Sequence, residues 1–256
     1  MSITILSLSL ILRRHFFPYL PLLCLVASLA LVPSLLDAQN EDDFARARRE
    51  MIERDLRPRG IKDQRVLKAM GAVPRHLFVP EKQRPAAYED RALAIGEDQT
   101  ISQPYVVALM SQLAGLKGKE RVLEVGTGSG YQAAVLSCLA ADVYTIEIIS
   151  SLADRARAIF SRLGYDNVWV KTGDGFFGWE EKAPFDVILV TASAEKIPDR
   201  LWQQLREGGR LIMPLGPERQ NQILIRATKI SGKPSVEKIT DVIFVPMTGA
   251  VKTENR

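Results

Sequence analysis

The sequence of 256 residues is poor in the side chains that most often perform redox, metal and acid–base chemistry, with two cysteines and two histidines. Cys24 lies in an apolar run near the start, which leaves Cys138 alone in the remainder. An internal disulfide or a cysteine metal cluster is therefore excluded for a chain without that run, and we expect no metal. Because His15 also lies near the start, His76 is the one remaining histidine, and a histidine base is scarcely available.

The sequence also lacks a strong excess of charge of one sign. It has 34 Lys and Arg against 30 Asp and Glu, a formal net charge of +4, and the two signs are interspersed. Its three tryptophans, Trp169, Trp179 and Trp202, are scattered and offer no aromatic platform for bases. These features indicate a mixed, solvated surface, and we expect no nucleic-acid partner.

One long apolar run is present, an uncharged stretch over residues 16–36 that follows Arg13 and Arg14. A basic flank, an apolar core and small residues are typical of a secretory signal, here with cleavage after Ala38. The run is also long enough to span a bilayer, although three prolines interrupt it. Residues 1–38 are therefore interpreted as a signal-like or membrane-anchor segment, with an untranslated extension as the alternative.

Residues 39–117 have helical spacing at both ends and an irregular middle. Apolar residues recur every three to four positions over residues 43–60 and 62–73, and again near residues 105–113. The irregular middle between these helices is rich in Pro, Gly, Asp and Gln, and its part over residues 87–103 is expected to be a long loop that covers a substrate. This part is predicted to be a small helical N-terminal region with a substrate loop.

Residues 118–256 alternate short β-rich runs with helical runs, which indicates an α/β fold with a mostly parallel sheet and helices on both faces. The final runs, 221–230 and 236–247, suggest an antiparallel edge. The expected strands span residues 121–125, 142–148, 168–172, 185–193 and 209–216, and the expected helices span 131–140, 151–164 and 199–205.

The stretch VLEVGTGSGYQAAVL, residues 122–136, places Gly126, Gly128 and Gly130 where the first of these strands turns into its helix. Three glycines let the backbone bend and approach a ligand, although a tight turn without a ligand is the alternative. A dinucleotide fingerprint needs a glycine where Tyr131 stands, and Glu124 would repel a pyrophosphate. A ligand with a sulfonium centre fits a nearby carboxylate better.

Two further carboxylates follow the next strands. Glu147 ends the second strand, where a ribose-binding acid lies in folds of this kind. Asp174 follows the third strand in TGDG, next to Gly175, and could accept a hydrogen bond from an adenine amino group. With the glycine loop, these residues resemble the cofactor site of class I S-adenosylmethionine-dependent methyltransferases, which have a Rossmann-like fold.

A narrower resemblance lies outside the glycine loop, in VPRHLFVP, AYEDRALAIGEDQTISQPYVVALM, PFDVILVTASAEKIPDRLWQQLREGGRLIMPLG and VIFVPMTG. These motifs are similar to the protein-L-isoaspartate O-methyltransferase family and run collinearly from residue 43 to residue 249. Two features depart from the family pattern: Asp98 stands where glycine is common, and residues 1–38 have no counterpart in most members.

The resemblance implies S-adenosylmethionine as methyl donor and the free α-carboxylate of L-isoaspartyl residues in damaged proteins and peptides as acceptor. The methyl ester then collapses to a succinimide that hydrolyses partly to aspartate. The implied cofactor-binding residues are Glu124, Gly126, Gly128, Ser129, Gly130, Glu147, Asp174 and Gly175. Ser102 is the implied active-site residue, with Ile101, Gln103 and Thr191 in the substrate loop and its surroundings.

The chemistry agrees with the scarcity of histidine, because a carboxylate with a pKa near ~4 is already an anion at pH 7 and needs no base. Ser102 could orient this carboxylate without acting as a nucleophile. Its alternative role is that of a helix N-cap before Pro104. Both roles are compatible, because a helix N-terminus attracts a carboxylate.

The alternatives are a methyltransferase for RNA or a small molecule, and a membrane-tethered binding module without activity. We expect a cytoplasmic monomer from the resemblance and from the supply of S-adenosylmethionine. Export or anchoring through residues 1–38 is the alternative, with membrane contact only if residues 16–36 are retained.

Overall fold

The computed structural model describes residues 41–218 and 220–251. Tertiary contacts divide the chain after Arg46. Residues 41–46 are helical and contain an ion pair of 2.9 Å between Arg46 Nη2 and Asp43 Oδ1. The predicted leader, residues 1–38, lies outside the described residues. Among those that are described, no helix is long and apolar enough to cross a membrane.

The predicted helical N-terminal region is present, and it contains a hairpin that the sequence analysis missed. Two short antiparallel strands lie inside the stretch expected to be a loop. Asp63 caps α2 by accepting a hydrogen bond of 2.9 Å from Arg65 N. The elements are η1 (Ile52–Leu56), α2 (Gln64–Ala72), η2 (Arg75–Phe78), η3 (Glu81–Ala86), β1 (Leu93–Gly96), β2 (Gln99–Ile101) and α3 (Pro104–Ala114).

A seven-stranded sheet forms the rest of the fold, in the order β5-β4-β3-β6-β7-β8-β9. The first five strands in this order are parallel, and β8 and β9 continue as an antiparallel edge. The expected fold class is therefore confirmed. The strands are β3 (Arg121–Val125), β4 (Asp142–Glu147), β5 (Val168–Thr172), β6 (Phe185–Val190), β7 (Leu205–Leu215), β8 (Gln222–Ile230) and β9 (Lys233–Val242). The helices are α4 (Tyr131–Ser137), α5 (Ser150–Leu163), η4 (Gly175–Phe177), η5 (Glu180–Lys182) and α6 (Asp199–Gln204).

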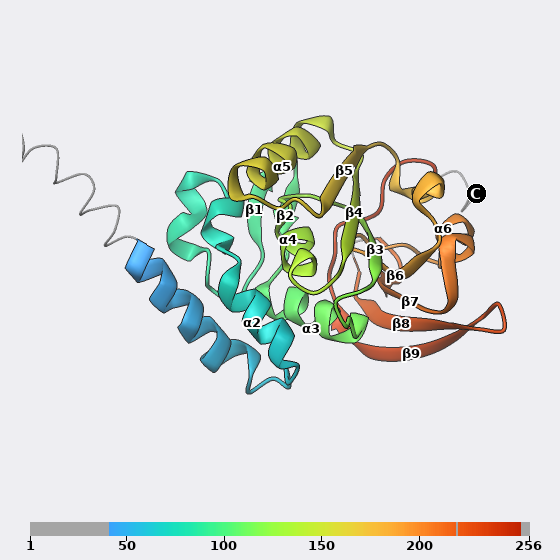
Figure 1. Cartoon of the computed structure of the whole chain (residues 1–256), viewed down its shortest axis with the longest axis horizontal. Helices are drawn as coiled ribbons and strands as arrows, with labels where there is room; N and C mark the ends of the chain where they lie inside the picture. The colour runs from blue at the N-terminus through green and yellow to red at the C-terminus, as the bar shows by residue number, and fades with distance from the viewer. Residues whose placement is uncertain (1–40, 219, 252–256) are drawn as a thin grey trace, which may run out of the picture. The chain divides into compact units, whose positions relative to one another are not determined.

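Helices cover both faces of the sheet, with α3, α4 and α5 on one face and α6 on the other (Figure 1). Successive side chains of a strand point to opposite faces, so Leu123 and Val125 enter the core beside Leu201 of α6. Glu124, between them, faces the other side. Burying an apolar side chain such as that of Leu123 or Val125 stabilises the fold by about 1.5–3 kcal/mol.

The strand order reverses at β3, which has β4 on one side and β6 on the other. In open parallel sheets, ligands bind at the carboxyl ends of strands at such a point. The glycine loop follows β3, Glu147 ends β4, and Thr191 follows β6, so three predicted site segments meet here.

Candidate active site

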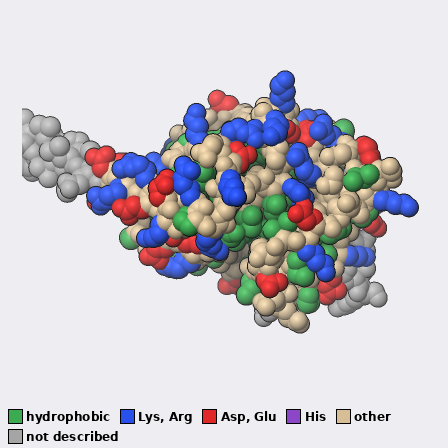
Figure 2. Space-filling model, turned by 90° about the horizontal axis from the view of Figure 1, so that it is seen from below, with side chains coloured by type: hydrophobic (Ala, Val, Ile, Leu, Met, Phe, Trp, Pro, Cys, Tyr) green, Lys and Arg blue, Asp and Glu red, His purple; other side chains and the backbone are tan. Residues whose placement is uncertain are grey.

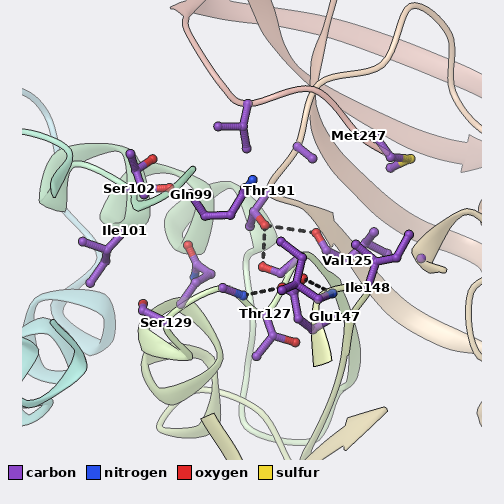
Figure 3. A pocket seen from close by; sticks show the side chains of 18 of the residues that line it. Gln99, Ile101, Ser102, Val125, Thr127, Ser129, Glu147, Ile148, Thr191 and Met247 are labelled. Carbon is purple, nitrogen blue, oxygen red and sulfur yellow. Dashed lines mark hydrogen bonds between the residues drawn. The ribbon is translucent and has the colours of Figure 1, made fainter. Parts of the chain in front are cut away.

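A cavity of about 250 Å³ opens at the carboxyl ends of β3, β4 and β6 (Figure 3). Its walls come from the glycine loop, the end of β4, the segment 99–102 and the late segment 245–248. Predicted site residues that line this cavity are Ile101, Ser102, Gly126, Gly128, Ser129, Glu147, Gly175 and Thr191.

The glycine loop is held close to the end of β6. Gly126 has a φ of 101°, and a Cβ atom there would lie 2.4 Å from Thr191 Oγ1. Thr191 Oγ1 instead donates a hydrogen bond of 2.7 Å to the carbonyl oxygen of Gly126. Gly130 faces away from the cavity, where a Cβ atom would lie 2.8 Å from Phe160 Cζ of α5. Gly126 therefore shapes the cavity, whereas Gly130 lets α5 pack closely.

Glu147 joins the end of β4 to the glycine loop. Its Oε2 accepts a hydrogen bond of 2.7 Å from Gly128 N, and its Oε1 accepts one of 2.9 Å from Ile149 N. The side chain is almost buried yet lines the cavity. Because a carboxylate oxygen has two lone pairs, both oxygens keep the capacity to accept hydrogen bonds from ligand hydroxyls.

Glu124 lies beneath the glycine loop and is not among the residues that line the cavity. It is fully buried, and its Oε2 accepts a hydrogen bond of 2.5 Å from Thr145 Oγ1. Thr145 Oγ1 lies 2.6 Å from Thr127 Oγ1, which reaches the cavity wall. Burial raises the pKa of Glu124 to about 8, so this carboxyl group is mostly protonated at pH 7. Glu124 thus reaches the cavity through two threonine hydroxyls.

Asp174 also lies behind the cavity wall. Its Oδ1 accepts a hydrogen bond of 2.9 Å from Phe176 N, and its Oδ2 accepts one of 2.7 Å from Ala250 N. The second contact fixes the late segment to the turn after β5. A hydrogen bond of 2.8 Å from Met247 N to Ser193 O fixes the same segment at another point. The predicted contact of Asp174 with an adenine amino group stays a prediction.

Ser102 lies where two cavities meet. A second cavity, of about 430 Å³, shares Thr100, Ser102, Thr191 and Val245 with the first, and Gln103 lines it. Within the described part of the chain, no group pairs with the Ser102 hydroxyl. The suggested N-cap role is wrong, because the N-cap residue of α3 is Gln103. The serine hydroxyl is therefore available to a ligand.

Comparisons with known proteins decide the family. The family model of protein-L-isoaspartate(D-aspartate) O-methyltransferase (PCMT) matches residues 46–252. The chain belongs to this family. A protein-L-isoaspartate O-methyltransferase from Opitutus terrae is 51% identical over 221 residues, which are 86% of this chain and 95% of the relative. One from Geobacter metallireducens is 52% identical over 208 residues, 81% of this chain and 96% of the relative.

Solved structures agree with this assignment. A protein-L-isoaspartate O-methyltransferase structure matches with a TM-score of 0.72 and 31% identity, over 80% of this chain and 67% of that chain. A Plasmodium falciparum protein matches with a TM-score of 0.67 and 28% identity, over 78% of this chain and 97% of that chain. The latter was solved in complex with S-adenosyl-L-homocysteine. The chain is thus an S-adenosylmethionine-dependent methyltransferase of the PCMT family.

Sequence reasoning missed several groups that build the site. Arg75 is fully buried and donates hydrogen bonds of 2.7 Å from Nε to Ala87 O and from Nη2 to Ser102 O. Asp90 supports the start of α3, and the segment 245–248 walls the first cavity. The late motif VIFVPMTG carried part of the family resemblance, and it was the available signal for this wall. Arg75 and Asp90 lie in two other motifs of that resemblance, VPRHLFVP and AYEDRALAIGEDQTISQPYVVALM, but nothing in these motifs shows that the two charges support Ser102.

Proposed function

We propose that this chain transfers the methyl group of S-adenosylmethionine to the free α-carboxylate of L-isoaspartyl residues in damaged proteins and peptides. The observation that carries this proposal is that the two cavities meet at Ser102. Thr191 lines both cavities as well. The first cavity would hold the donor and the second the isoaspartyl segment. The product is a methyl ester, whose collapse to a succinimide starts the repair.

The residues of the first cavity fit a donor of this kind. Gly126 has no side chain and so lets the loop lie directly against Thr191, and Glu147 presents a carboxylate at the end of β4. S-adenosylmethionine supplies a methyl group on a positively charged sulfur, which becomes a neutral thioether leaving group. Glu147 would accept hydrogen bonds from the ribose hydroxyls, and the backbone from Gly126 to Ser129 would lie against the amino-acid portion.

The protein then has to place a carboxylate oxygen in line with the methyl group. The acceptor is an anion at neutral pH and needs no base, which agrees with the position of His76, buried with Nδ1 2.8 Å from the Tyr88 hydroxyl. The unpaired hydroxyl of Ser102 would donate a hydrogen bond to the other acceptor oxygen. Positioning of this kind is worth roughly 7–11 kcal/mol of the barrier.

The chain would act in the cytoplasm as a monomer, with residues 1–38 as a separate leader, 39–117 as the region that carries the substrate loop and 118–256 as the catalytic core. Mixed surface charge supports a protein rather than a nucleic-acid acceptor: Figure 2 shows Lys and Arg side chains among Asp and Glu on one face. Fractionation of cells that express the tagged full chain tests the compartment, and membrane association lost without residues 1–38 would contradict it.

The repair reaction itself gives the test of function. A synthetic L-isoaspartyl peptide is incubated with the full chain and S-adenosylmethionine at pH 7, and its products are separated by liquid chromatography. We expect methyl ester, then succinimide, then a growing share of the aspartyl peptide. A peptide that stays unmodified while S-adenosylhomocysteine still binds to the protein would contradict the proposal and favour another acceptor.

A further inference from the structure

The first turn of α3 receives its cap from a residue 15 positions away in the sequence. The N-cap residue, Gln103, makes no side-chain cap hydrogen bond. The Oδ1 atom of Asp90 accepts a hydrogen bond of 3.0 Å from Tyr105 N, one of the backbone donors that a helix start leaves unpaired. Asp90 thus does the work of a capping residue for the helix that follows Ser102.

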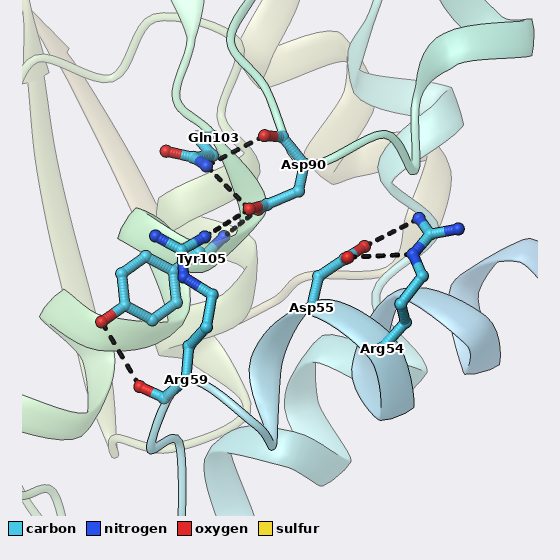
Figure 4. A network of polar contacts seen from close by, with 6 residues as sticks. All are labelled: Arg54, Asp55, Arg59, Asp90, Gln103 and Tyr105. Atoms are coloured by element: carbon cyan, nitrogen blue, oxygen red, sulfur yellow. Dashed lines mark hydrogen bonds and ion pairs between the residues drawn. The ribbon is translucent and has the colours of Figure 1, made fainter.

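Asp90 also holds the side chain between Ser102 and α3 (Figure 4). Gln103 Nε2 donates to Asp90 Oδ2 at 2.7 Å and to the carbonyl oxygen of Asp90 at 2.9 Å. Arg59 Nη1 donates to the same Oδ2 at 2.5 Å, and its guanidinium lies over the Tyr105 ring, 3.5 Å from the centroid. The Asp90 side chain is only 16% exposed, so its carboxylate is largely shielded from water, whereas Arg59 is 44% exposed.

The carbonyl group of Ser102 is fixed as well, because Arg75 Nη2 donates a hydrogen bond to its oxygen. Arg75 therefore holds the backbone of Ser102 directly. Asp90 holds the residues that follow, through the Gln103 side chain and the backbone N–H of Tyr105. In contrast, the Ser102 hydroxyl makes no hydrogen bond within the described ranges. A residue whose backbone, together with the residues that follow, is held by two buried or partly buried groups, while its own hydroxyl makes no hydrogen bond, is arranged to act on a ligand.

We propose that Asp90 is a positioning residue for Ser102. Through Gln103 and Tyr105 it fixes the start of α3 and so aims the Ser102 hydroxyl at the junction of the two cavities. This inference rests on the proposed function, in which that hydroxyl orients the acceptor carboxylate. Asp90 itself lines neither cavity, so it acts through its neighbours and not by touching the substrate.

A substitution to asparagine tests this role with little change of shape. The carboxylate presents an oxygen to Tyr105 N and another to Gln103 and Arg59. An amide has one oxygen, so Asp90→Asn must place an NH2 group against donors at one of these two positions. The capping contact or the Gln103 and Arg59 contacts are then lost.

Asp55 offers a matched control in the same region. Its carboxylate pairs with Arg54 through two hydrogen bonds of 2.9 Å, and its side chain is 15% exposed. No hydrogen bond joins Asp55 to the segment 101–105 among the described residues (Figure 4). Asp55→Asn therefore removes a carboxylate of similar burial and pairing without touching the support of Ser102.

The experiment is a double-mutant cycle on the full chain, with Asp90→Asn and Ser102→Ala alone and together. For the labelled-methyl transfer to an isoaspartyl peptide, we expect Asp90→Asn to lower kcat about tenfold when Ser102 is present. In the Ser102→Ala background, we expect the same change to alter kcat by less than about twofold. Asp55→Asn should leave kcat within about twofold of the starting chain in both backgrounds.

A second readout does not depend on turnover. The Kd of the isoaspartyl peptide for the chain saturated with S-adenosylhomocysteine should follow the same non-additive pattern, while the Kd of S-adenosylhomocysteine alone changes by less than about threefold. Equal loss of kcat in both backgrounds, or no loss in either, would overturn the inference. If Asp90→Asn does not fold, Asp90→Glu is used, which keeps the charge beside Arg59 and displaces the acceptor oxygens by one methylene.

The two failures are distinguishable. A starting chain that transfers no methyl group to the isoaspartyl peptide would refute the proposed function. An active chain with additive effects of Asp90→Asn and Ser102→Ala would refute only the positioning role.

Discussion

Arg75 and Ser102 are joined by a hydrogen bond of 2.7 Å from a fully buried guanidinium to a backbone carbonyl. The same side chain holds Ala87 O at 2.7 Å and lies 4.8 Å from the centre of the Tyr131 ring. Burial lowers the pKa of Arg75 to about 10, so the side chain stays cationic at neutral pH. A side chain in the interior of the fold thus holds the backbone of the candidate active-site serine.

The first prediction concerns this contact. Arg75→Lys keeps the charge, but an ammonium group cannot reproduce the fork that reaches Ala87 O and Ser102 O together. One buried carbonyl is left unpaired, and we expect a loss of about 1–3 kcal/mol in the free energy of unfolding. Urea denaturation measures it. Arg65→Lys, at an exposed ion pair, should change stability by less than about 0.5 kcal/mol, and an equal effect of both variants would refute this role of Arg75.

A second prediction separates two glycines near the cavity. Gly126→Ala places a methyl group against Thr191 Oγ1 at a φ of 101°, so the loop has to move and Thr191 loses its hydrogen bond. Gly173→Ala meets nothing within 4 Å and has no positive φ. Calorimetric titration with S-adenosylhomocysteine should show at least about tenfold weaker binding for the first variant and an unchanged Kd for the second. Equal affinities would contradict the assigned role of Gly126.

The sequence predicted the sheet well because its signals are local. Short β-rich runs and helical spacing set β3 and β5 at their observed bounds, and the glycine loop falls where expected. The support of Ser102 was not predictable in this way. Arg75 contacts Ser102 from 27 residues away, and Asp90 contacts Gln103 and Tyr105 from 13 and 15 residues away, so neither contact can be read from the local sequence.

The missed hairpin of β1 and β2 has a similar explanation. Its turn is formed by Glu97 and Asp98, with φ values of 55° and 54°, in the left-handed region that Gly and Asn favour. Neither residue is a hairpin signal in the sequence. Asp98, which stands where the family commonly has glycine, therefore holds its side chain on a strained backbone in a tight turn.

A third prediction follows from this strain. Asp98→Gly should stabilise the protein by about 0.5–1 kcal/mol, because glycine adopts a positive φ without a steric penalty. Thermal unfolding should show a rise of about 1–4 °C in Tm. Asp98→Ala is the control, because alanine keeps the penalty and should give no gain. A gain of equal size from alanine would show that loss of charge, and not the backbone, is responsible.

A fourth prediction concerns pH. The pKa of Glu124 is raised from 4.5 to about 8, so between these values the folded state binds a proton that the unfolded state does not. The contribution of Glu124 to stability therefore falls as pH rises through this window, by up to about 1.4 kcal/mol per pH unit, and levels off above it. Glu124→Gln is neutral throughout, and its stability relative to the starting chain should increase from pH 5 to pH 8.

Urea denaturation at several pH values measures this difference. Glu53→Gln is the control, because Glu53 is exposed and pairs with Arg57 on the surface, and its profile should parallel that of the starting chain. A Glu124→Gln profile that also runs parallel would show that Glu124 is ionised at neutral pH in the folded protein.

The most direct measurement is the transfer of labelled methyl from S-adenosylmethionine to two peptides that differ only in L-isoaspartate or L-aspartate at one position. With the full chain, we predict base-labile methyl ester on the isoaspartyl peptide alone, strongly reduced by Ser102→Ala. Equal labelling of both peptides, or of neither while S-adenosylhomocysteine binds, would contradict the account.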